Sequence, residues 1–212
     1  MKKIILATCL CIAAANLGAQ DMKTLFVNIP DLYIPQLESA WRKDLVDLFL
    51  AGKEADLKHT MDGHAHLFKL TDSYILLQTT ARTTIEMKRL PLVNDTYIIC
   101  MVTTLDGPAP DSRVQFYTTD WKPLPNDGIF APVDVEWFVR ADADRNSDAF
   151  KDAMARLDMD LISYSLSPDD DNLKAVYTTP LYLSPTERAK VMPFLKEELK
   201  VYVWKKGFFA ES

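Results

Sequence analysis

The sequence has few of the residues from which catalytic and metal sites are most often built. It contains three cysteines and three histidines in 212 residues, and all three histidines lie between positions 59 and 66. It contains no G-x-S-x-G, H-E-x-x-H or Ser-x-x-Lys motif and no glycine-rich phosphate loop. An enzyme of the Ser-His-Asp or Cys-His type would therefore have to use one of these three histidines as its base.

The chain also lacks an apolar run long enough to cross a bilayer as a helix. Ile4–Ala15 is apolar over 12 residues, whereas a helical span needs about 20. Two lysines precede this run, and the small residues Gly18 and Ala19 follow it. Basic, apolar and small-residue regions in this order are typical of a secretory signal peptide. We therefore predict a signal peptide at residues 1–19 and a single α+β domain at residues 20–212.

The cysteines raise the alternative of a lipid-anchored protein. Cys9 and Cys11 do not follow a complete apolar region and small residues, so soluble export is favoured over lipidation. Cleavage would leave Cys100 as the last cysteine, and a single cysteine cannot form an internal disulfide. Cys100 lies in the apolar run Ile98–Val102, which predicts a small buried side chain and not a reactive thiol.

Acidic residues outnumber basic residues. Without Lys2 and Lys3 the chain would carry 22 Lys and Arg against 30 Asp and Glu, which gives a net charge of −8. An acidic protein repels phosphate backbones, and the sequence contains no basic patch with interleaved aromatic residues. These features argue against nucleic acid as a partner.

The middle of the chain predicts an antiparallel sheet. Short β-rich segments follow one another with turn signals between them, at Leu67–Leu70, Tyr74–Thr80, Thr83–Leu92, Tyr97–Leu105 and Arg113–Thr118. Ile85 and Met87 alternate with polar residues, so one face of their strand should be buried. Tyr97–Val102 is apolar on both faces and should form the central strand. Two later segments, Leu173–Thr178 and Leu199–Lys205, also have strand patterns.

Helical signals flank this region on both sides. They predict a helix from Gln36 to Leu50, a helix at Ser147–Leu157 that Leu161–Leu166 would continue, and a helix start at Ser184-Pro185-Thr186-Glu187. Thr24–Ile34 has some strand character, and Val133–Val139 fits either a strand or a short helix. The predicted fold class is α+β, an antiparallel β-meander sheet of about five to seven strands with helices packed on one face and at the ends.

The histidines are the first candidates for a site. His59, His64 and His66 cluster around Asp62, and His64 and His66 would share one strand face because side chains alternate. Two imidazoles with a nearby carboxylate suit Zn²⁺ or Cu²⁺, but no third or fourth ligand can be named. The simpler explanation, an exposed strand start after the Asp62-Gly63 turn, is favoured, and we assign no metal ligand.

Two acidic segments resemble cation sites without completing one. Asp142–Asp148 places oxygen side chains at alternate positions, as a calcium loop does, but Ser147 and Ala153 stand where that loop requires Gly and Glu. An acidic helix N-terminus explains the same residues. Asp169-Asp170-Asp171 follows a proline in a turn, where adjacent acids are usually solvated.

Aromatic residues would suit a flat sugar- or peptide-binding surface. The candidates are Tyr117, Trp121, Tyr182, Tyr202 and Trp204, but alternating strand positions favour packing in the core instead. A carboxylate pair for acid–base catalysis cannot be chosen either, because its members would have to converge in space. The sequence therefore assigns no catalytic, cofactor-binding or metal-binding residue.

Several segments are similar to a known family. They are Asn28-Ile29-Pro30-Asp31, Leu70–Tyr74, Leu77-Gln78, Thr83–Lys88 leading to Leu90-Pro91-Leu92, Phe116-Tyr117, and Asp120–Leu124. Together they resemble an uncharacterised family of exported Bacteroidales proteins, the domain of unknown function 3256, over most of the mature chain. The resemblance implies export to a Bacteroidales cell envelope and no assigned activity. His64 and His66 lie outside its motif, which weakens the metal-site explanation.

The function expected from these observations is that of an exported, non-catalytic binding or assembly factor in the periplasm or at the outer envelope. Its partner would be an envelope macromolecule or glycan. The alternatives are an exported hydrolase with Asp or Glu as acid and base, and a metal-binding protein that uses His64 and His66. A binding factor predicts an exposed apolar or aromatic patch. A hydrolase predicts a pocket that holds two carboxylates with separated pKa values.

Overall fold

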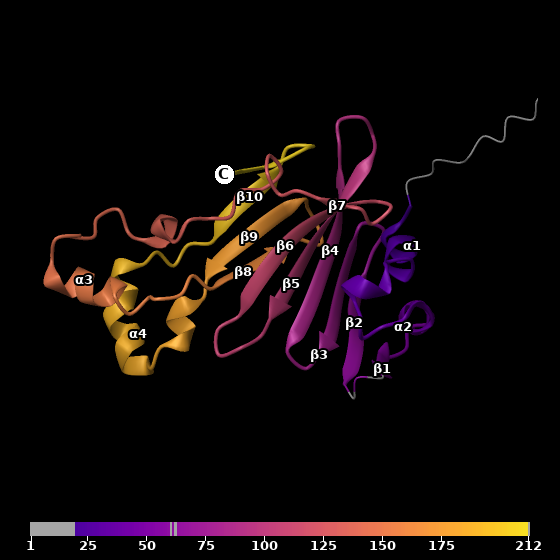
Figure 1. Cartoon of the computed structure of the whole chain (residues 1–212), viewed down its shortest axis with the longest axis horizontal. Helices are drawn as coiled ribbons and strands as arrows, with labels where there is room; N and C mark the ends of the chain where they lie inside the picture. The colour runs from indigo at the N-terminus through magenta and orange to yellow at the C-terminus, as the bar shows by residue number, and fades with distance from the viewer. Residues whose placement is uncertain (1–19, 60, 62, 212) are drawn as a thin grey trace, which may run out of the picture.

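The structure is a computed structural model that describes residues 20–59, 61 and 63–211. Its largest element is a seven-stranded antiparallel sheet whose neighbouring strands follow one another along the chain (Figure 1). The strands are β1 (Asp56–Lys58), β2 (His64–Leu70), β3 (Tyr74–Thr80), β4 (Thr83–Pro91), β5 (Tyr97–Leu105), β6 (Asp111–Thr118) and β7 (Pro123–Leu124). The predicted meander is confirmed, with β1 and β7 added at its edges. The predicted signal peptide lies outside the described residues.

The two faces of this sheet are buried in two different cores. Along β5, Ile99 and Met101 join one core, and Ile98, Cys100 and Val102 join the other. These neighbours separate because successive side chains of a strand point to opposite faces. Burial on both faces confirms β5 as a central strand, and Cys100 is confirmed as a fully buried side chain.

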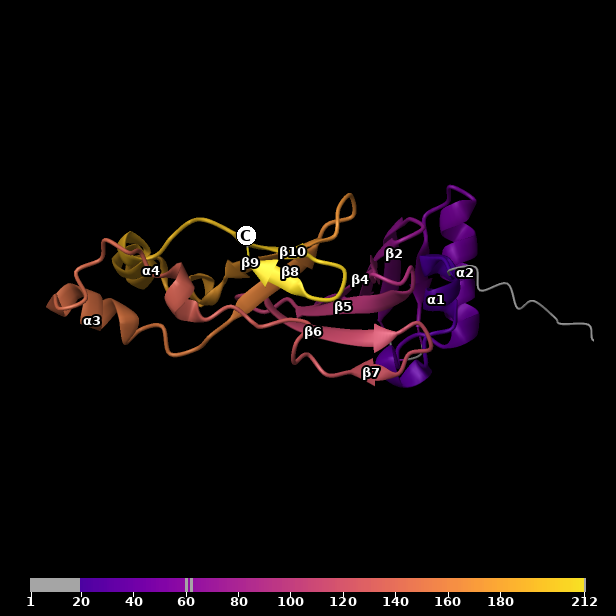
Figure 2. The same cartoon turned by 90° about the horizontal axis from the view of Figure 1, so that it is seen from above.

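Two helices, α1 (Met22–Val27) and α2 (Ser39–Leu50), cover the first face, with a 3₁₀ turn, η1 (Asp31–Tyr33), between them. Figure 2 shows both helices stacked on one side of the large sheet. α2 confirms the helix predicted at 36–50. No helix among the described residues is long and apolar enough to cross a membrane.

The strand character expected at 24–34 is wrong, because this segment begins inside α1. Asp21 caps that helix by accepting a hydrogen bond from the Thr24 amide at 2.8 Å. Leu25 and Phe26 are then buried against the sheet from one side of the helix. A cap and a single apolar helix turn outweigh the weak strand pattern.

Arg42 of α2 ties the helical layer together from inside. Its side chain is 2 % exposed, and its guanidinium donates to the Ile29 carbonyl at 2.7 Å and the Val27 carbonyl at 3.2 Å. It also donates to the Leu37 carbonyl and to Asp31, the latter at 2.8 Å. The Val27 carbonyl ends α1, and the Ile29 and Leu37 carbonyls lie in the irregular chain between α1 and α2. The arginine therefore supplies hydrogen bonds to the backbone carbonyls of the segment that links the two helices.

A second, four-stranded sheet covers the other face of the large sheet. Its strands are β8 (Ile162–Leu166), β9 (Asn172–Tyr177), β10 (Lys200–Trp204) and β11 (Phe209–Glu211), in the order β11-β10-β9-β8. The strands expected near 173–178 and 199–205 are confirmed, and they belong to this separate sheet. The helix continuation expected at 161–166 is wrong: Ile162, Tyr164 and Leu166 alternate into the core as strand residues do.

The free edge of β8 lies against the large sheet and is hydrogen-bonded to its side chains. The Ile162 amide donates to Asp111 at 3.2 Å, and the Tyr164 amide donates to Ser112 at 3.0 Å. The Leu166 amide donates to Glu86 at 3.0 Å. An exposed strand edge would otherwise invite pairing with another chain.

Short helices form a third region beyond the second sheet, at the left of Figure 1. They are η2 (Val135–Phe138), α3 (Asp148–Met154), η3 (Thr179–Tyr182), α4 (Pro185–Val191) and η4 (Met192–Phe194). Ser184 caps α4, as the sequence predicts, and of the two cap candidates for α3, Asn146 and Ser147, the structure has Ser147. The segment left open at 133–139 contains η2. Helices on one face and at the ends confirm the predicted α+β class.

Replacing Arg42 tests the link between the first two helices. Arg42→Met keeps the apolar stem but removes the guanidinium donors to the Val27, Ile29 and Leu37 carbonyls. We expect the free energy of unfolding to fall by about 3 kcal/mol, because each unsatisfied buried acceptor is costly. Urea unfolding followed by circular dichroism measures it. Lys43→Met, at the exposed neighbouring position, should leave the midpoint nearly unchanged, and equal losses in both variants would contradict this role.

Candidate functional site

An apolar cavity lies where β9 and β10 stop pairing. The last paired residues are Ala175 and Lys200. Beyond them the strands part, and a cavity of about 330 Å³ opens between Val176–Tyr177 on one side and Glu197–Glu198 on the other. We call it the Tyr177 cavity. It is a small concave site of the size that holds an apolar group of a ligand.

Contacts with η2 cause this separation of the strands. The Arg140 amide donates to the Phe194 carbonyl at 2.9 Å, and the Lys196 amide donates to the Phe138 carbonyl at 2.7 Å. These bonds flank an isolated antiparallel bridge between Val139 and Leu195. The chain after η4 is thus paired with η2 and not with β9, and it rejoins the second sheet only at Lys200.

The walls of the Tyr177 cavity are mostly apolar. Phe138, Val176, Leu181, Met192 and Leu195 are among the lining residues. The Tyr177 ring stacks on the Phe138 ring with the ring centroids 5.5 Å apart, which gives the cavity a rigid aromatic wall. Such a lining favours an apolar ligand group over a charged one.

The cations around the cavity are engaged by backbone carbonyls. Arg188 of α4 donates to the Pro180 and Leu181 carbonyls, each at 2.8 Å, and so holds η3 in place as a wall. Lys196 donates to the Trp137 carbonyl at 2.6 Å and lies 4.4 Å from the centre of the Trp137 ring. Their role is to shape the site.

Two of the apolar lining residues are partly exposed, and we call them the rim. Val176 is 39 % exposed, and Leu181 is 45 % exposed. Tyr182 follows the lining residue Leu181 and is 55 % exposed, and Leu199 follows the lining residue Glu198 and is 48 % exposed. A wider, shallower depression of about 700 Å³ adjoins the cavity across Met192 and Leu195. Apolar surface gathered around a cavity is typical of a binding site.

The aromatic residues considered as a binding surface divide into two groups. Tyr117, Trp121, Tyr202 and Trp204 are at most 7 % exposed, which confirms that they pack in the core. Only Tyr182 of the five is exposed, and it follows Leu181, which lines the Tyr177 cavity. Sequence reasoning did not identify this site, because its walls come from η2, β9, η3, η4 and α4, which no sequence pattern brings together.

A buried polar cluster lies between the two sheets. Glu86 accepts hydrogen bonds from the Tyr74 hydroxyl at 2.8 Å and from the Leu166 amide at 3.0 Å. Burial raises the pKa of the Glu86 carboxyl, and these two hydrogen bonds oppose the shift. Burial, followed by the neighbouring Glu86 carboxyl, also raises the pKa of Tyr74. Glu86 lines none of the cavities described here.

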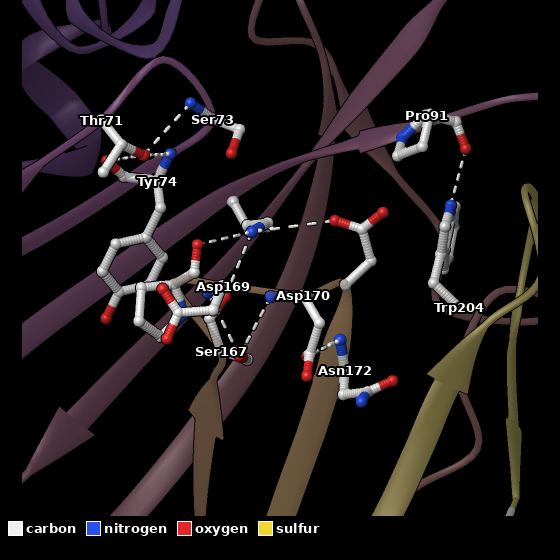
Figure 3. A network of polar contacts seen from close by, with 12 residues as sticks. Thr71, Ser73, Tyr74, Pro91, Ser167, Asp169, Asp170, Asn172 and Trp204 are labelled. Atoms are coloured by element: carbon white, nitrogen blue, oxygen red, sulfur yellow. Dashed lines mark hydrogen bonds and ion pairs between the residues drawn. The ribbon is translucent and has the colours of Figure 1, made fainter.

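Lys88 fastens the turn between β8 and β9 to the large sheet. It is 3 % exposed and donates to the Ser167 and Pro168 carbonyls, each at 3.2 Å, with Asp171 at 3.7 Å. Figure 3 shows this turn, in which the Asp170 amide donates to the Ser167 hydroxyl at 3.2 Å. The acids at 169–171 therefore shape a turn, in agreement with the explanation favoured from the sequence.

The histidines do not converge as the sequence suggested. His59 is buried, and its ring nitrogens face the Thr79 carbonyl at 3.0 Å and the Met61 amide at 3.2 Å. His64 and His66 do share one face of β2. Asp56 of β1 lies beside both, with one oxygen 2.6 Å from His64 Nδ1 and the other 3.6 Å from His66 Nδ1.

Within the described ranges 20–59, 61 and 63–211, no group of three or more His, Cys, Asp and Glu side chains could hold a metal ion. Asp62 lies outside these ranges. The calcium-like segment is also explained by local bonds. Asp142 pairs with Arg140 at 2.8 Å, which lowers the pKa of Asp142, and Asp144 accepts from the Asn146 amide at 3.1 Å.

Comparison with known proteins places the chain in a family without an assigned activity. The family described as Protein of unknown function (DUF3256) matches residues 14–209. One solved structure, a domain of an uncharacterized protein from Porphyromonas gingivalis W83, is similar at 30 % identity with a TM-score of 0.82. The match covers 92 % of this chain and 98 % of that chain. No curated protein matches.

Glu86→Gln tests the buried carboxyl. Because the pKa of Glu86 is higher in the folded protein than its ordinary 4.5, its stabilising contribution is complete below about pH 4.5 and is lost as pH rises through the folded pKa. Gln keeps an oxygen for both donors and carries no charge at any pH. We therefore expect the variant to melt above the wild type near neutral pH, with the difference closing on acidification.

Thermal unfolding across this pH range measures the difference. Glu197→Gln, at an exposed position, is the matched control and should follow the wild type throughout. A Glu86→Gln difference that stayed constant with pH would contradict the effect of burial on this carboxyl.

Proposed function

Because the chain belongs to the DUF3256 family, to which no activity is assigned, we propose a function from the Tyr177 cavity and its rim. The protein acts as an exported, non-catalytic binding or assembly factor of the periplasm or outer cell envelope. It takes an apolar group of its partner into the Tyr177 cavity, and the rim contacts the surface around that group. The apolar cavity with its exposed rim is the observation that carries this proposal.

The chemistry of the cavity supports binding over hydrolysis. A hydrolase would need two convergent carboxyls with separated pKa values. Glu86 is the carboxyl whose pKa burial raises, and it lies between the sheets and away from the Tyr177 cavity. Glu197 and Glu198 lie at the cavity as exposed neighbours on one strand-like segment.

Export rests on the sequence that precedes the described residues. Lys2 and Lys3, the apolar run Ile4–Ala15 and the small residues before Gln20 have the order of a secretory leader. An exported chain with one remaining cysteine depends on packing for its stability, and Cys100 is fully buried. This location makes components of the envelope the relevant partners.

A thermal-shift screen of residues 20–212 tests the proposal. The ligands are medium-chain fatty acids, apolar hexapeptides, neutral glycans and divalent metal ions. We expect the apolar classes to raise the melting temperature, since a ligand at a hundred times its dissociation constant stabilises by about 2.7 kcal/mol. In a domain of this size that is a shift of several degrees.

The Val176→Trp variant tests whether a rise in melting temperature comes from ligand binding in the Tyr177 cavity. The larger side chain fills the opening from β9, so the variant should fold normally and lose the response to apolar ligands. Lys174→Trp is the matched control, because it places the same ring two residues away on the same outer face. Equal responses in the two variants, or a response to metal ions alone, would contradict the proposal.

A further inference from the structure

Two hairpin turns project together from one end of the molecule. They are the β4–β5 turn, residues 92–96, and the β10–β11 turn, residues 205–208. Figure 1 shows both at the top of the molecule. The Trp204 indole donates to the Pro91 carbonyl at 2.6 Å, and this bond joins the bases of the two hairpins. The turns therefore form one surface, which we call the hairpin end.

Each turn carries a large apolar side chain on its outside. Val93 is 80 % exposed and Phe208 is 48 % exposed. Their neighbours Leu92 and Phe209 pack into the core, so burial of the hairpins does not require Val93 or Phe208 to be apolar. Lys205 and Lys206 stand beside Phe208 and are exposed. An exposed aromatic ring next to lysines is typical of side chains at a membrane interface.

The two turns are held in defined conformations. The Leu92 amide donates to the Thr96 carbonyl at 2.8 Å, and Asn94 accepts from the Thr96 hydroxyl at 2.6 Å. The Lys205 amide donates to the Phe208 carbonyl at 2.8 Å. Val93 and Phe208 are thus presented outward by closed turns, and little ordering is needed for them to enter an apolar medium.

The start of the described chain lies at the same end. Arg89, near the end of β4, donates to the Gln20 carbonyl at 2.8 Å, and the Met22 amide donates to the Asp72 carbonyl at 2.9 Å. The apolar run of the predicted leader ends at Ala15. The four residues between that run and Gln20 span at most about 14 Å. A chain still attached to its leader would hold the hairpin end close to the bilayer.

We propose that the hairpin end docks on the surface of an anionic phospholipid bilayer. Val93 and Phe208 enter the interface between headgroups and acyl chains, and Lys205 and Lys206 contact lipid phosphates. Acidic residues also lie at this end, namely Asp95 in the β4–β5 turn, Asp72, and Asp171 at 3.7 Å from Lys88 of β4. Apolar insertion therefore supplies most of the affinity, and Lys205 and Lys206 supply the preference for anionic lipid. The Tyr177 cavity takes no part in this contact.

Vesicle co-sedimentation of residues 20–212 tests the docking surface, since the described core lies within these residues and the leader cannot contribute. We expect binding to phosphatidylcholine vesicles that contain about 30 % phosphatidylglycerol, weaker binding to phosphatidylcholine alone, and a decrease with added salt. Val93→Ser with Phe208→Ser should lower the partition coefficient by about tenfold. Lys205→Gln with Lys206→Gln should remove the preference for anionic vesicles.

Leu105→Ser is the matched control. Leu105 is 58 % exposed and ends β5 at the side opposite the β4–β5 turn, so this variant should bind vesicles as the wild type does. Binding to neither vesicle type, or equal binding by the Val93 and Phe208 double variant, would overturn the proposal. Self-association in ultracentrifugation that this double variant abolishes would assign the surface to a second copy of the chain and also overturn it.

The vesicle experiment and the thermal-shift screen test different surfaces of the protein. Apolar ligands in solution and the Val176→Trp variant report on ligand binding in the Tyr177 cavity. Vesicles and the hairpin variants report on membrane binding by the hairpin end. Loss of one response leaves the other measurable in the same protein.

Discussion

The hydrogen bonds along the free edge of β8 decide how the two sheets of this protein fit together. Three backbone amides of that edge donate to Asp111, Ser112 and Glu86 of the large sheet. A buried strand edge without acceptors would cost about 1–3 kcal/mol for each amide. The second sheet is therefore positioned by specific polar contacts, while its apolar face supplies the area that keeps it in place.

The candidate site is a consequence of this arrangement. β8 positions β9, and β9 pairs with β10 only as far as Ala175 and Lys200. The chain before Lys200 is drawn instead toward η2 by the bridge between Val139 and Leu195. The Tyr177 cavity lies in the space between these two pairings. The shape of the cavity thus depends on the β9–β10 pairing and on the bridge between Val139 and Leu195. It also depends on Arg188, which fixes η3 by donating to the Pro180 carbonyl.

Local patterns predicted much of the secondary structure correctly. The Ser184–Glu187 cap and the helix at 36–50 were predictable because their defining contacts lie within three or four residues. The segment 161–166 was not, since five residues of mixed apolar pattern fit a helix or a strand, and only the partner strand β9 decided it. Asp56 was missed as the neighbour of His64 because β1 is too short to show a period.

The sequence alone determined the α+β class, the meander, the burial of Cys100 and the Ser184 cap of α4, since alternation and capping act between near neighbours. The tertiary structure decided which strands share a sheet, which side chains accept the β8 amides and where a cavity opens. The Leu166 amide and Glu86 are 80 positions apart, and the Ile162 amide and Asp111 are 51 apart. Contacts at such separations arise from the packing of whole elements, so no local pattern of residues encodes them.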